Sequence, residues 1–457
     1  MQVTGMADKG MAVGRNEEGQ VVFLTDVVPG DTIDALLIRK KKGVWQGVPH
    51  NYVTYSKERV NPKCEHFADC GGCKWQHFKY DAQLREKETI VRDAMHRIAQ
   101  VEIGDFKSIL AAPKVFGYRN KMEYSFSNRR WKTKDEIERD NVEDRSQALG
   151  LHPPGFFDKV VDIETCWLQD EPSNHIRNFI RQYAIEHQLQ FFDPVLHKGF
   201  LRNMILRNNR DGDWMLIMSF YTPDHKAIRL LLDAVIEAFP QLSSVFYVVN
   251  QKKNDTLYDQ EFVHYYGATY LTEMLGPISY QIRPKSFFQT NTMQAENLYR
   301  LAKDLADLQG NEVVYDLYTG IGSIASYVAD RCSVVVGIEE VEDAILDARE
   351  NARANHIENA NFYSGDVKQI FTNELLVTHG KPDVVITDPP RGGMHENVTR
   401  SIMDMRPGVI VYISCNPATQ ARDIKILSEN YKVESIQPVD MFPHTNHIES
   451  VAKLVLK

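Results

Sequence analysis

A cysteine stands at the end of a predicted buried strand in the stretch VYISCNPAT, residues 411–419. A run of β-forming residues ends at Ser414, and Asn416-Pro417 predicts a turn directly after Cys415. A thiol that only fills a core needs no such turn, whereas a nucleophile must be presented at the end of its strand. We therefore interpret Cys415 as a candidate nucleophile, with a buried structural thiol as the alternative.

Two carboxylates complete a set of groups that carbon-5 chemistry on a pyrimidine requires. Asp388 closes a predicted strand in TDPPR (387–391), and Glu449 lies in HIESV (447–451). Carbon 5 becomes nucleophilic after a thiolate adds to carbon 6, and a base must later remove the carbon-5 proton. We predict that Cys415 adds, that Glu449 is the base and that Asp388 contacts the edge of the ring. We also expect the site to lower the pKa of the thiol.

A cofactor turn precedes these residues. DLYTGIGSIA (316–325) predicts a strand, a Gly-x-Gly turn and a helix, and the glycines allow a ligand to approach the backbone closely. Glu339 or Glu340 follows the next strand, where a carboxylate accepts ribose hydroxyls, and position favours Glu339. Asp366 follows the strand after that, within reach of an adenine. The third glycine of a dinucleotide site is missing, which favours S-adenosylmethionine over NAD.

Three cysteines crowd into ten residues, and a fourth lies far along the chain. In a cytoplasmic chain this pattern indicates a metal or cluster site and not a disulfide framework. From spacing alone, zinc fits almost as well as an iron–sulfur cluster. The four candidate ligands are Cys64, Cys70, Cys73 and Cys166.

Length and pattern divide the chain of 457 residues, 43% of them apolar, into three regions. Short strands punctuated by Gly and Pro over residues 1–59 predict an OB-type β-barrel. Residues 60–280 read as a mixed α+β domain that contains the cysteines and a helix from Tyr80 to Ala99. Alternating strands and helices over residues 281–457 predict a Rossmann-like, doubly wound parallel sheet.

The charge is unevenly distributed along the chain. Residues 1–134 hold 23 basic and 16 acidic side chains, a balance of +7, whereas the rest holds 30 and 46, a balance of −16. A basic front half is compatible with a polyanionic partner, and ordinary scatter of charge is the alternative. No apolar run is long enough for a membrane span, and no signal peptide precedes the first strand, so we expect a cytoplasmic protein. Candidate RNA contacts, each with a surface role as the alternative, are Lys40, Lys41, Arg119, Lys121, Arg129, Arg130 and Trp131.

Several sequence blocks in a fixed order resemble one family. The chain is similar to the RNA uracil-C5 methyltransferases, in the branch with an N-terminal TRAM domain and an iron–sulfur cluster. The blocks are CEHFADCGGCKWQH (64–77), YRNKMEYSF (118–126), LGLHPPGFFDKVVDIETC (149–166), FFQTN (287–291), DLYTGIGSIA (316–325), TDPPRGG (387–393), SCNPATQARD (414–423) and HIESV (447–451).

The resemblance implies a role for each matched residue. Cys415 is then the nucleophile, Glu449 the base, and the four cysteines hold a [4Fe-4S] cluster. It also implies a flipped uridine of 23S ribosomal RNA as substrate and no obligate protein partner. The positions implied to bind S-adenosylmethionine or the target base are Gln289, Tyr318, Ser323, Glu339, Asp366 and Asp388.

Three other functions stay open at this point. A transfer RNA uridine would use the same chemistry, although relatives that act on transfer RNA commonly lack the barrel and the cysteines. A cytosine-C5 methyltransferase uses the same thiol addition, but HIESV has no counterpart there. A non-catalytic iron–sulfur RNA-binding protein would not need Cys415, Glu449 and Asp388. Two departures from the family pattern are Thr319, where many members have Cys, and an acidic insert at 135–145.

Overall fold

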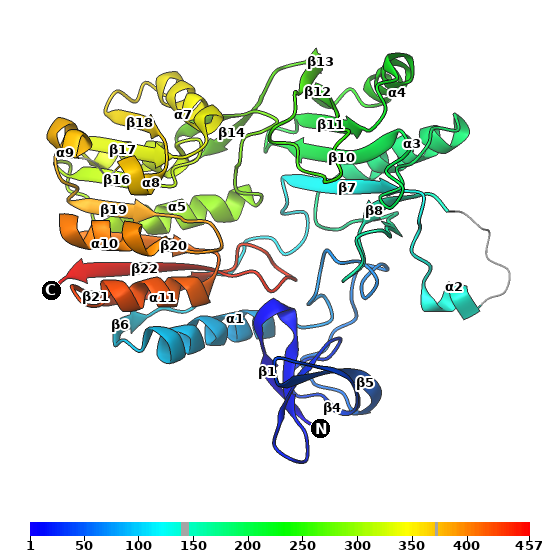
Figure 1. The fold of residues 1–457 in the computed structure, drawn as a ribbon, viewed down its shortest axis with the longest axis horizontal. Helices are drawn as coiled ribbons and strands as arrows, with labels where there is room; N and C mark the ends of the chain where they lie inside the picture. The colour runs from blue at the N-terminus through cyan, green and yellow to red at the C-terminus, as the bar shows by residue number, and fades with distance from the viewer. Residues whose placement is uncertain (139–145, 371–372) are drawn as a thin grey trace.

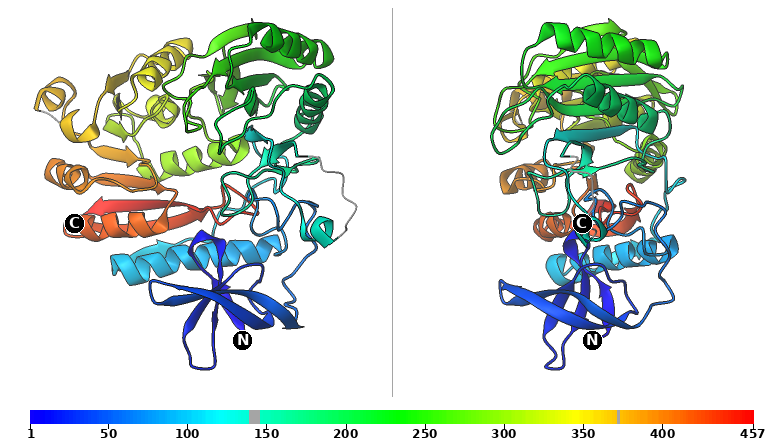
Figure 2. Two further views of the ribbon diagram at one scale, coloured as in Figure 1. Left: turned by 45° about the vertical axis from the view of Figure 1, so that its right-hand side comes forward. Right: turned by 90° about the vertical axis from the view of Figure 1, so that its right-hand side faces the viewer.

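The structure is a computed structural model that describes residues 1–138, 146–370 and 373–457. Three sheets dominate it, and Figure 1 and Figure 2 show them as an N-terminal barrel, a central sheet and a C-terminal sheet flanked by helices. Of the predicted acidic insert, residues 139–145 lie outside the described ranges. Among the described residues, no helix is long and apolar enough to cross a membrane.

The N-terminal region is a five-stranded sheet in the order β1-β2-β3-β5-β4. An isolated bridge between Gln2 and Thr32 joins its two edges, so the sheet closes on itself. Trp75 and Phe78, from the segment after the barrel, complete its apolar core. The predicted N-terminal β-rich region is therefore confirmed. Its strands are β1 (Val3–Met6), β2 (Ala12–Arg15), β3 (Val21–Leu24), β4 (Thr32–Lys41) and β5 (Val44–Thr54).

The central sheet has seven strands in the order β13-β12-β11-β10-β7-β8-β9. Helices α3 (Ser173–Glu186) and α4 (His225–Ala238) bury their apolar residues against one face of it. A short helix, α2 (Lys134–Glu138), precedes β8. The strands are β7 (Lys121–Ser127), β8 (Ala148–Leu151), β9 (Val161–Asp162), β10 (Leu201–Asn208), β11 (Trp214–Phe220), β12 (Leu242–Val249) and β13 (Val263–Gly267).

The C-terminal sheet has eight strands in the order β18-β17-β16-β19-β20-β22-β21-β6. The five strands from β18 to β20 are parallel neighbours, and β22 lies antiparallel between β20 and β21. This confirms the predicted doubly wound sheet. The strands are β6 (Ile103–Phe106), β16 (Val313–Leu317), β17 (Val334–Glu339), β18 (Ala360–Ser364), β19 (Val384–Thr387), β20 (Val409–Ser414), β21 (Tyr431–Val439) and β22 (Glu449–Leu456).

Helices cover both faces of this sheet, as the strand–helix alternation predicts. One face packs against α5, α6 and α7, and the other against α1, α8, α10 and α11. A separate hairpin, β14 (Leu271–Leu275) and β15 (Ile278–Ile282), precedes α5. The helices are α1 (Tyr80–Ala94), α5 (Thr292–Ala306), α6 (Ser323–Val328), α7 (Glu342–Ala354), α8 (Val367–Ile370), α9 (Asn373–His379), α10 (Glu396–Met405) and α11 (Pro417–Leu427).

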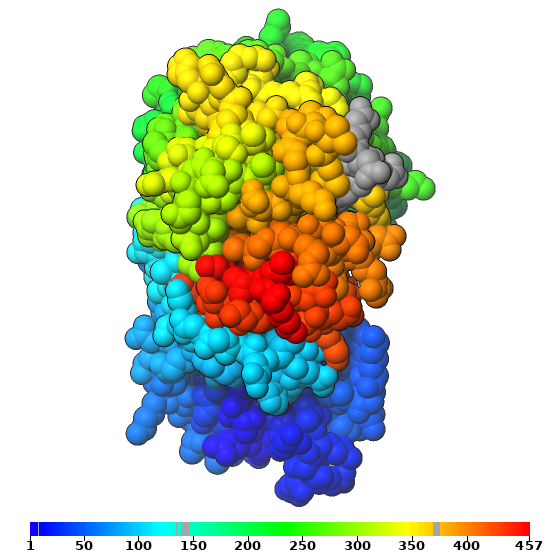
Figure 3. Space-filling view, turned by 90° about the vertical axis from the view of Figure 1, so that its left-hand side faces the viewer, coloured from blue at the N-terminus to red at the C-terminus, as the bar shows by residue number. Residues whose placement is uncertain are grey.

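Residues 80–106 join the C-terminal layer although they follow the barrel in sequence. Helix α1 continues into a π-helical turn at Met95–Ala99, which matches the predicted helix, and β6 then pairs in parallel with β21. Figure 3 shows this cyan segment between the blue barrel and the red C-terminal strands. The predicted region 60–280 therefore contributes to two sheets: β6 belongs to the C-terminal sheet, and β7 to β13 form the central sheet.

Candidate active site

The strand register places Cys415 opposite Glu449. Strands β20 and β22 are antiparallel, and their last paired residues at this end are Ser414 and Ser450. Glu449 is the first residue of β22, and Cys415 directly follows the last residue of β20, so the two residues belong to one edge of the sheet. That edge is also where the parallel strands β16 to β19 end, because the carboxyl ends of parallel strands meet on one side.

The turn after β20 is held by its own side chains. Asn416 caps α11 by accepting a hydrogen bond from the Ala418 amide at 3.1 Å, and Pro417 occupies the first helical position. The side-chain amide of Asn416 donates a hydrogen bond to the Arg391 backbone carbonyl at 3.0 Å. Cys415 therefore sits half-buried between a fixed strand end and a capped helix, on the side of the loop that carries Arg391.

Two carboxyl groups, Asp388 and Glu449, influence each other at this edge. Burial, together with Asp316, raises the pKa of Asp388 to about 7. Burial and the neighbouring Asp388 raise the pKa of Glu449 well above its ordinary value, while the Arg391 guanidinium acts in the opposite direction. A pair of like charges in a partly dehydrated site disfavours double ionisation. Burial and a neighbouring carboxyl group therefore favour the neutral form of both groups in this structure.

The prediction that the site lowers the pKa of the thiol is wrong for this structure. Burial, Glu449 and Asp388 together raise the pKa of Cys415 to about 11, and Arg391 only partly opposes them. Negative neighbours disfavour a thiolate for the same reason that they disfavour a second carboxylate. Burial and the two carboxyl groups therefore favour the neutral thiol in this structure.

Two of the predicted cofactor positions, the glycine turn and Glu339, lie against each other. The carboxylate of Glu339 accepts hydrogen bonds from the Gly320 and Val341 amides, both at 3.1 Å. The backbone of Gly320 has φ +56°, and no atom lies within 4 Å of the place where a Cβ would stand. The turn thus leaves open space beside its backbone, as a close ligand approach requires. Tyr318, half-buried with φ +64°, lines the same turn.

The remaining predicted cofactor positions differ in their surroundings. Asp366 caps α8 by accepting a hydrogen bond from the Lys368 amide at 3.0 Å. The Ser323 hydroxyl is engaged with the Tyr299 hydroxyl at 3.1 Å. Gln289 is buried, and its carbonyl accepts a hydrogen bond from Asn120 at 2.9 Å, which ties this segment to the start of β7.

Sequence reasoning missed three residues of this edge. Tyr299, on α5, is buried, and its hydroxyl faces the charges of Asp388, Asp316 and Glu449, which help to raise its pKa. Asp316 is buried near the end of β16, directly before the glycine turn, and accepts hydrogen bonds from the Ala325 amide and the Thr319 hydroxyl. The Arg391 guanidinium acts to lower the pKa of both Cys415 and Glu449, against the effect of burial. Asp316 and Arg391 lie inside quoted motifs, whereas no local pattern marks Tyr299.

The four predicted metal ligands line one small cavity in the central region, together with His66, Gln76 and Trp167 among others. Each of the six cysteines is a free thiol. Within the described ranges, no three His, Cys, Asp or Glu side chains are grouped closely enough to hold a single metal ion. A tetrahedral zinc site requires four ligands about 2.3 Å from one centre, whereas a cubane cluster bonds each thiolate to a different iron. The four cysteines thus share one cavity, and both zinc and an iron–sulfur cluster stay open at this point.

Several predicted RNA contacts are already engaged within the protein. Arg130 pairs with Glu136 at 2.7 Å, and the Trp131 indole donates to Asp69 at 2.8 Å. Arg129 pairs with Asp193 at 3.4 Å. These contacts favour a structural role for the three residues. The list of candidates that stay compatible with RNA contact is then Lys40 and Lys41 on the exposed end of β4, half-buried Arg119, and Lys121, whose pKa burial lowers to about 8.

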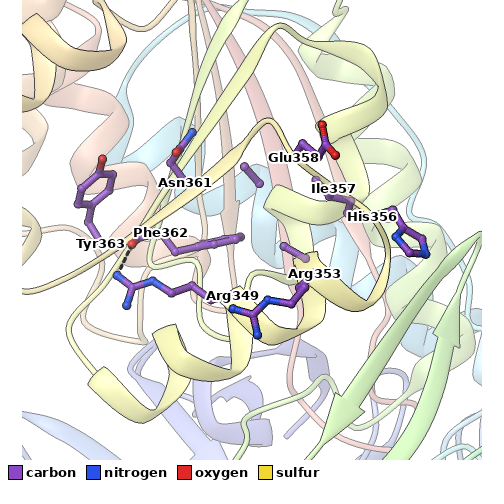
Figure 4. A pocket seen from close by; sticks show the side chains of 10 residues that line it. Arg349, Arg353, His356, Ile357, Glu358, Asn361, Phe362 and Tyr363 are labelled. Atoms are coloured by element: carbon purple, nitrogen blue, oxygen red, sulfur yellow. Dashed lines mark hydrogen bonds between the residues drawn. The ribbon is translucent and has the colours of Figure 1, made fainter.

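A separate groove of about 570 Å³ runs beside the edge strand β18, as Figure 4 shows. Arg349 and Arg353 of α7 lie along it, and Arg349 donates a hydrogen bond to the Phe362 carbonyl at 2.7 Å. None of the predicted catalytic, cofactor or metal residues lines this groove. Its size therefore says nothing about the chemistry at the Cys415 edge.

Comparisons with known proteins cover the whole chain. The family described as tRNA (Uracil-5-)-methyltransferase matches residues 244–457. Proteins named "Uncharacterized RNA methyltransferase" from Bacteroides thetaiotaomicron and Porphyromonas gingivalis are each 45% identical, and the matches cover 99% and 100% of this chain and 100% and 99% of the relatives. The crystal structure of Pyrococcus abyssi tRNA (uracil-54, C5)-methyltransferase with S-adenosyl-L-homocysteine matches at 30% identity, with full coverage of both chains and a TM-score of 0.76.

Proposed function

We propose that this chain, which belongs to the RNA (uracil-5-)-methyltransferase family, attacks its uracil with Cys415 and releases the product with Glu449. The activity of the family is S-adenosylmethionine-dependent methylation of uracil carbon 5 in RNA. The observation that carries the proposal is the register of β20 and β22, which puts a thiol and a buried carboxyl group at opposing positions of one sheet edge.

The reaction assigns one task to each group. The Cys415 thiolate forms a bond to carbon 6, and the electrons of the carbon 5–carbon 6 double bond move onto the ring as an enolate. S-adenosylmethionine supplies the methyl group that carbon 5 takes up. Glu449 then accepts the carbon-5 proton, the double bond re-forms, and the carbon 6–sulfur bond breaks to return the thiolate. Asp388 contacts the polar edge of the ring.

The predicted cofactor positions support the same assignment. We place the ribose of S-adenosylmethionine at Glu339, the adenine near Asp366 and the remainder along the open glycine turn, with Tyr318, Ser323 and Gln289 around it. A cationic sulfonium close to Asp388 would favour the ionised state of the carboxyl groups and of the thiol. The high pKa of Cys415 in this structure is therefore compatible with a nucleophile that is activated when both substrates are present.

We further propose that Cys64, Cys70, Cys73 and Cys166 hold a [4Fe-4S] cluster. The shared cavity of the four cysteines supports this, and the family resemblance favours iron over zinc. The Gly72 amide lies 3.4 Å from the Cys70 sulfur, a contact typical of thiolate ligands. Methyl transfer requires no redox step, so the cluster has a structural role in this proposal.

The proposed substrate is a flipped uridine of 23S ribosomal RNA, bound by the N-terminal barrel and the central region in the cytoplasm. The resemblance to the branch with a TRAM domain and four cysteines supports ribosomal RNA. Transfer RNA is the second candidate, because the Pyrococcus abyssi enzyme named for transfer RNA matches this chain over its full length. The region limits 1–59, 60–280 and 281–457 remain part of the proposal, except that residues 80–106 pack with the C-terminal sheet.

RNA that contains 5-fluorouridine tests the chemistry and the substrate together. The fluorine on carbon 5 replaces the proton that the base must remove. The thiol therefore cannot be released, and the covalent adduct should persist on a denaturing gel. We expect a shifted band with wild type and S-adenosylmethionine, and none with Cys415→Ala. Ribosomal and transfer RNA are offered separately, and the one that shifts identifies the substrate class. No band with either RNA, from protein that binds the cofactor, would overturn the proposed nucleophile.

A further inference from the structure

The loop of residues 440–448 connects β21 to β22 and delivers the proposed base, because Glu449 is the first residue of β22. Figure 1 shows this loop in red at the end of the C-terminal sheet that faces the rest of the molecule. A base at the very start of a strand takes its position from the loop that precedes it as well as from the ladder behind it. The contacts that anchor residues 440–448 therefore help to fix the position of Glu449.

The first anchor is a fully buried ion pair. Lys87 of α1 and Asp440 both have 0% exposure, and the ammonium lies 2.6 Å from the Asp440 carboxylate. The same ammonium donates to the Phe442 carbonyl at 3.1 Å, and the Tyr80 hydroxyl donates to the other Asp440 oxygen at 2.8 Å. A buried charge must be paired and hydrogen-bonded, so these contacts fix the start of the loop.

The second set of anchors holds the middle of the loop. The Tyr118 hydroxyl donates to the Pro443 carbonyl at 3.0 Å. The carbonyl of His444 accepts hydrogen bonds from the Lys74 and Trp75 amides at 2.9 and 3.0 Å. The His444 amide in turn donates to the buried Gln83 side chain at 3.0 Å. In this set, every group that contacts the loop comes from residues 74–118, far from the loop in sequence.

We propose that four residues are positioning residues for Glu449: Tyr80, Gln83, Lys87 and Tyr118. They anchor the loop of residues 440–448 and thereby fix the position of Glu449 at its end. The inference rests on the proposed function, because it assigns Glu449 the task of removing the carbon-5 proton. All four lie outside residues 244–457, the part that the family description matches. The N-terminal half of the chain thus completes the active site as well as contacting RNA.

The chemistry predicts which step depends on these residues. Cys415 and the predicted cofactor positions stand on other loops, so addition to carbon 6 and methyl transfer do not need the loop at 440–448. Transfer of the carbon-5 proton to the Glu449 carboxylate, with cleavage of the carbon 6–sulfur bond, does need it. A displacement of about 1 Å at a reacting group can slow a step roughly a hundredfold. A loosened loop should therefore stall the enzyme after methyl transfer.

The test follows the stalled species with natural RNA and isotopically labelled S-adenosylmethionine. Tyr118→Phe removes one hydroxyl and keeps the ring, and a methylated covalent adduct should then accumulate while steady-state turnover falls about tenfold. The matched control is Tyr431→Phe, because the Tyr431 hydroxyl is also buried and donates to a proline carbonyl, that of Pro407, at 2.9 Å. The control should turn over like wild type without an adduct.

A second variant removes the buried pair without leaving one charge alone. Lys87→Met combined with Asp440→Asn should accumulate more adduct than Tyr118→Phe, with turnover reduced about a hundredfold. Both the rate of the first methyl transfer in a single turnover and the affinity for S-adenosylmethionine should stay near those of wild type. Loss of methyl transfer and adduct together, or unchanged turnover in both variants, would overturn the positioning role.

The wild-type protein separates this inference from the proposed function. If wild type forms no adduct with 5-fluorouridine RNA, the assignment of Cys415 fails and the positioning role falls with it. If wild type forms that adduct but the variants release natural RNA normally, only the positioning role is wrong.

Discussion

The catalytic edge and the cysteine cavity both gather reactive side chains, but they are built from different parts of the fold. Cys415 and Glu449 stand at the ends of paired strands, and the register of β20 and β22 fixes them opposite each other. Cys64, Cys70, Cys73 and Cys166 all lie outside helices and strands, in loops that meet around one cavity. A hydrogen-bonded ladder maintains the first arrangement, whereas packing, separate hydrogen bonds such as that from the Cys70 amide to the His66 carbonyl, and the proposed cluster would maintain the second.

The difference predicts how each site responds to damage. Substitution at the catalytic edge should alter chemistry and leave the fold intact, because the strands pair through their backbones. Loss of the bound group at the cysteine cavity should lower stability, because loops that converge on a metal centre derive much of their order from it. Four experiments test this contrast.

The largest effect is expected from Glu449→Gln. The neutral amide cannot accept the carbon-5 proton, so turnover should fall roughly a thousandfold while a methylated covalent adduct accumulates on natural RNA. Glu434→Gln, an exposed carboxylate of β21 that pairs with Lys453 at 2.9 Å, is the control. The melting temperature of both variants should match wild type, and a large fall for Glu449→Gln would contradict the idea that this edge is held by its backbone.

Cys70→Ser should have the next largest effect, on stability. A serine ligand binds iron poorly, so iron content and the visible absorption should fall, and the melting temperature should drop by roughly 10 °C. Cys332→Ser, another buried thiol that lies in the core of the C-terminal sheet, should keep its iron. Affinity for S-adenosylmethionine should survive in the Cys70 variant if the two regions differ as described. Retention of full iron content would exclude Cys70 as a ligand.

Glu339→Gln should weaken S-adenosylmethionine binding between about tenfold and a hundredfold, since charge-assisted hydrogen bonds to a ribose are lost. Titration calorimetry of the cofactor measures this directly. Glu340→Gln, an exposed neighbour with the same chemistry, tests whether position alone selects Glu339. A larger loss for the Glu340 variant would reverse the assignment.

The smallest effect is a pH dependence of cofactor affinity. Burial raises the pKa of Asp388 to about 7 and the pKa of Glu449 well above its ordinary value. A cationic cofactor favours their ionised forms, so binding should release protons. Affinity should therefore rise a few-fold between pH 5 and about pH 8 and then level off. Calorimetry in buffers of different ionisation enthalpy counts the released protons, and Asp388→Asn should flatten the dependence. Affinity that falls with pH would show that the carboxyl groups do not sense the cofactor.

Much of this molecule is predictable from local patterns. The parallel strands, the β-rich N-terminal region and the helix beginning at Tyr80 all follow from short-range periodicity and turn residues. The glycine turn beside Glu339 was predictable for the same reason, because the residues of the turn and the strand ends carry the signal themselves. The RNA-contact candidates were less successful, because a basic side chain shows no sign in sequence of the acid with which it pairs, as Arg130 does with Glu136.

Contacts between distant residues were not predictable. Tyr299 reaches the carboxyl groups only because α5 packs on the sheet beside them. The sign of the thiol's pKa shift depends on which charges surround Cys415 in space, and the negative ones prevail in this structure.

The sequence by itself determined which groups are available for chemistry and on which local elements they stand: a thiol at a strand end, a carboxylate at a strand start and a glycine turn before a helix. Hydrophobic periodicity and turn chemistry act over a few residues, so they can be read from the chain. Only the tertiary structure decided that Cys415 faces Glu449, that four loop cysteines share a cavity, and that Lys87 pairs with Asp440. Strand order, burial and charge pairing depend on residues that lie from tens to hundreds of positions apart, and no local pattern encodes them.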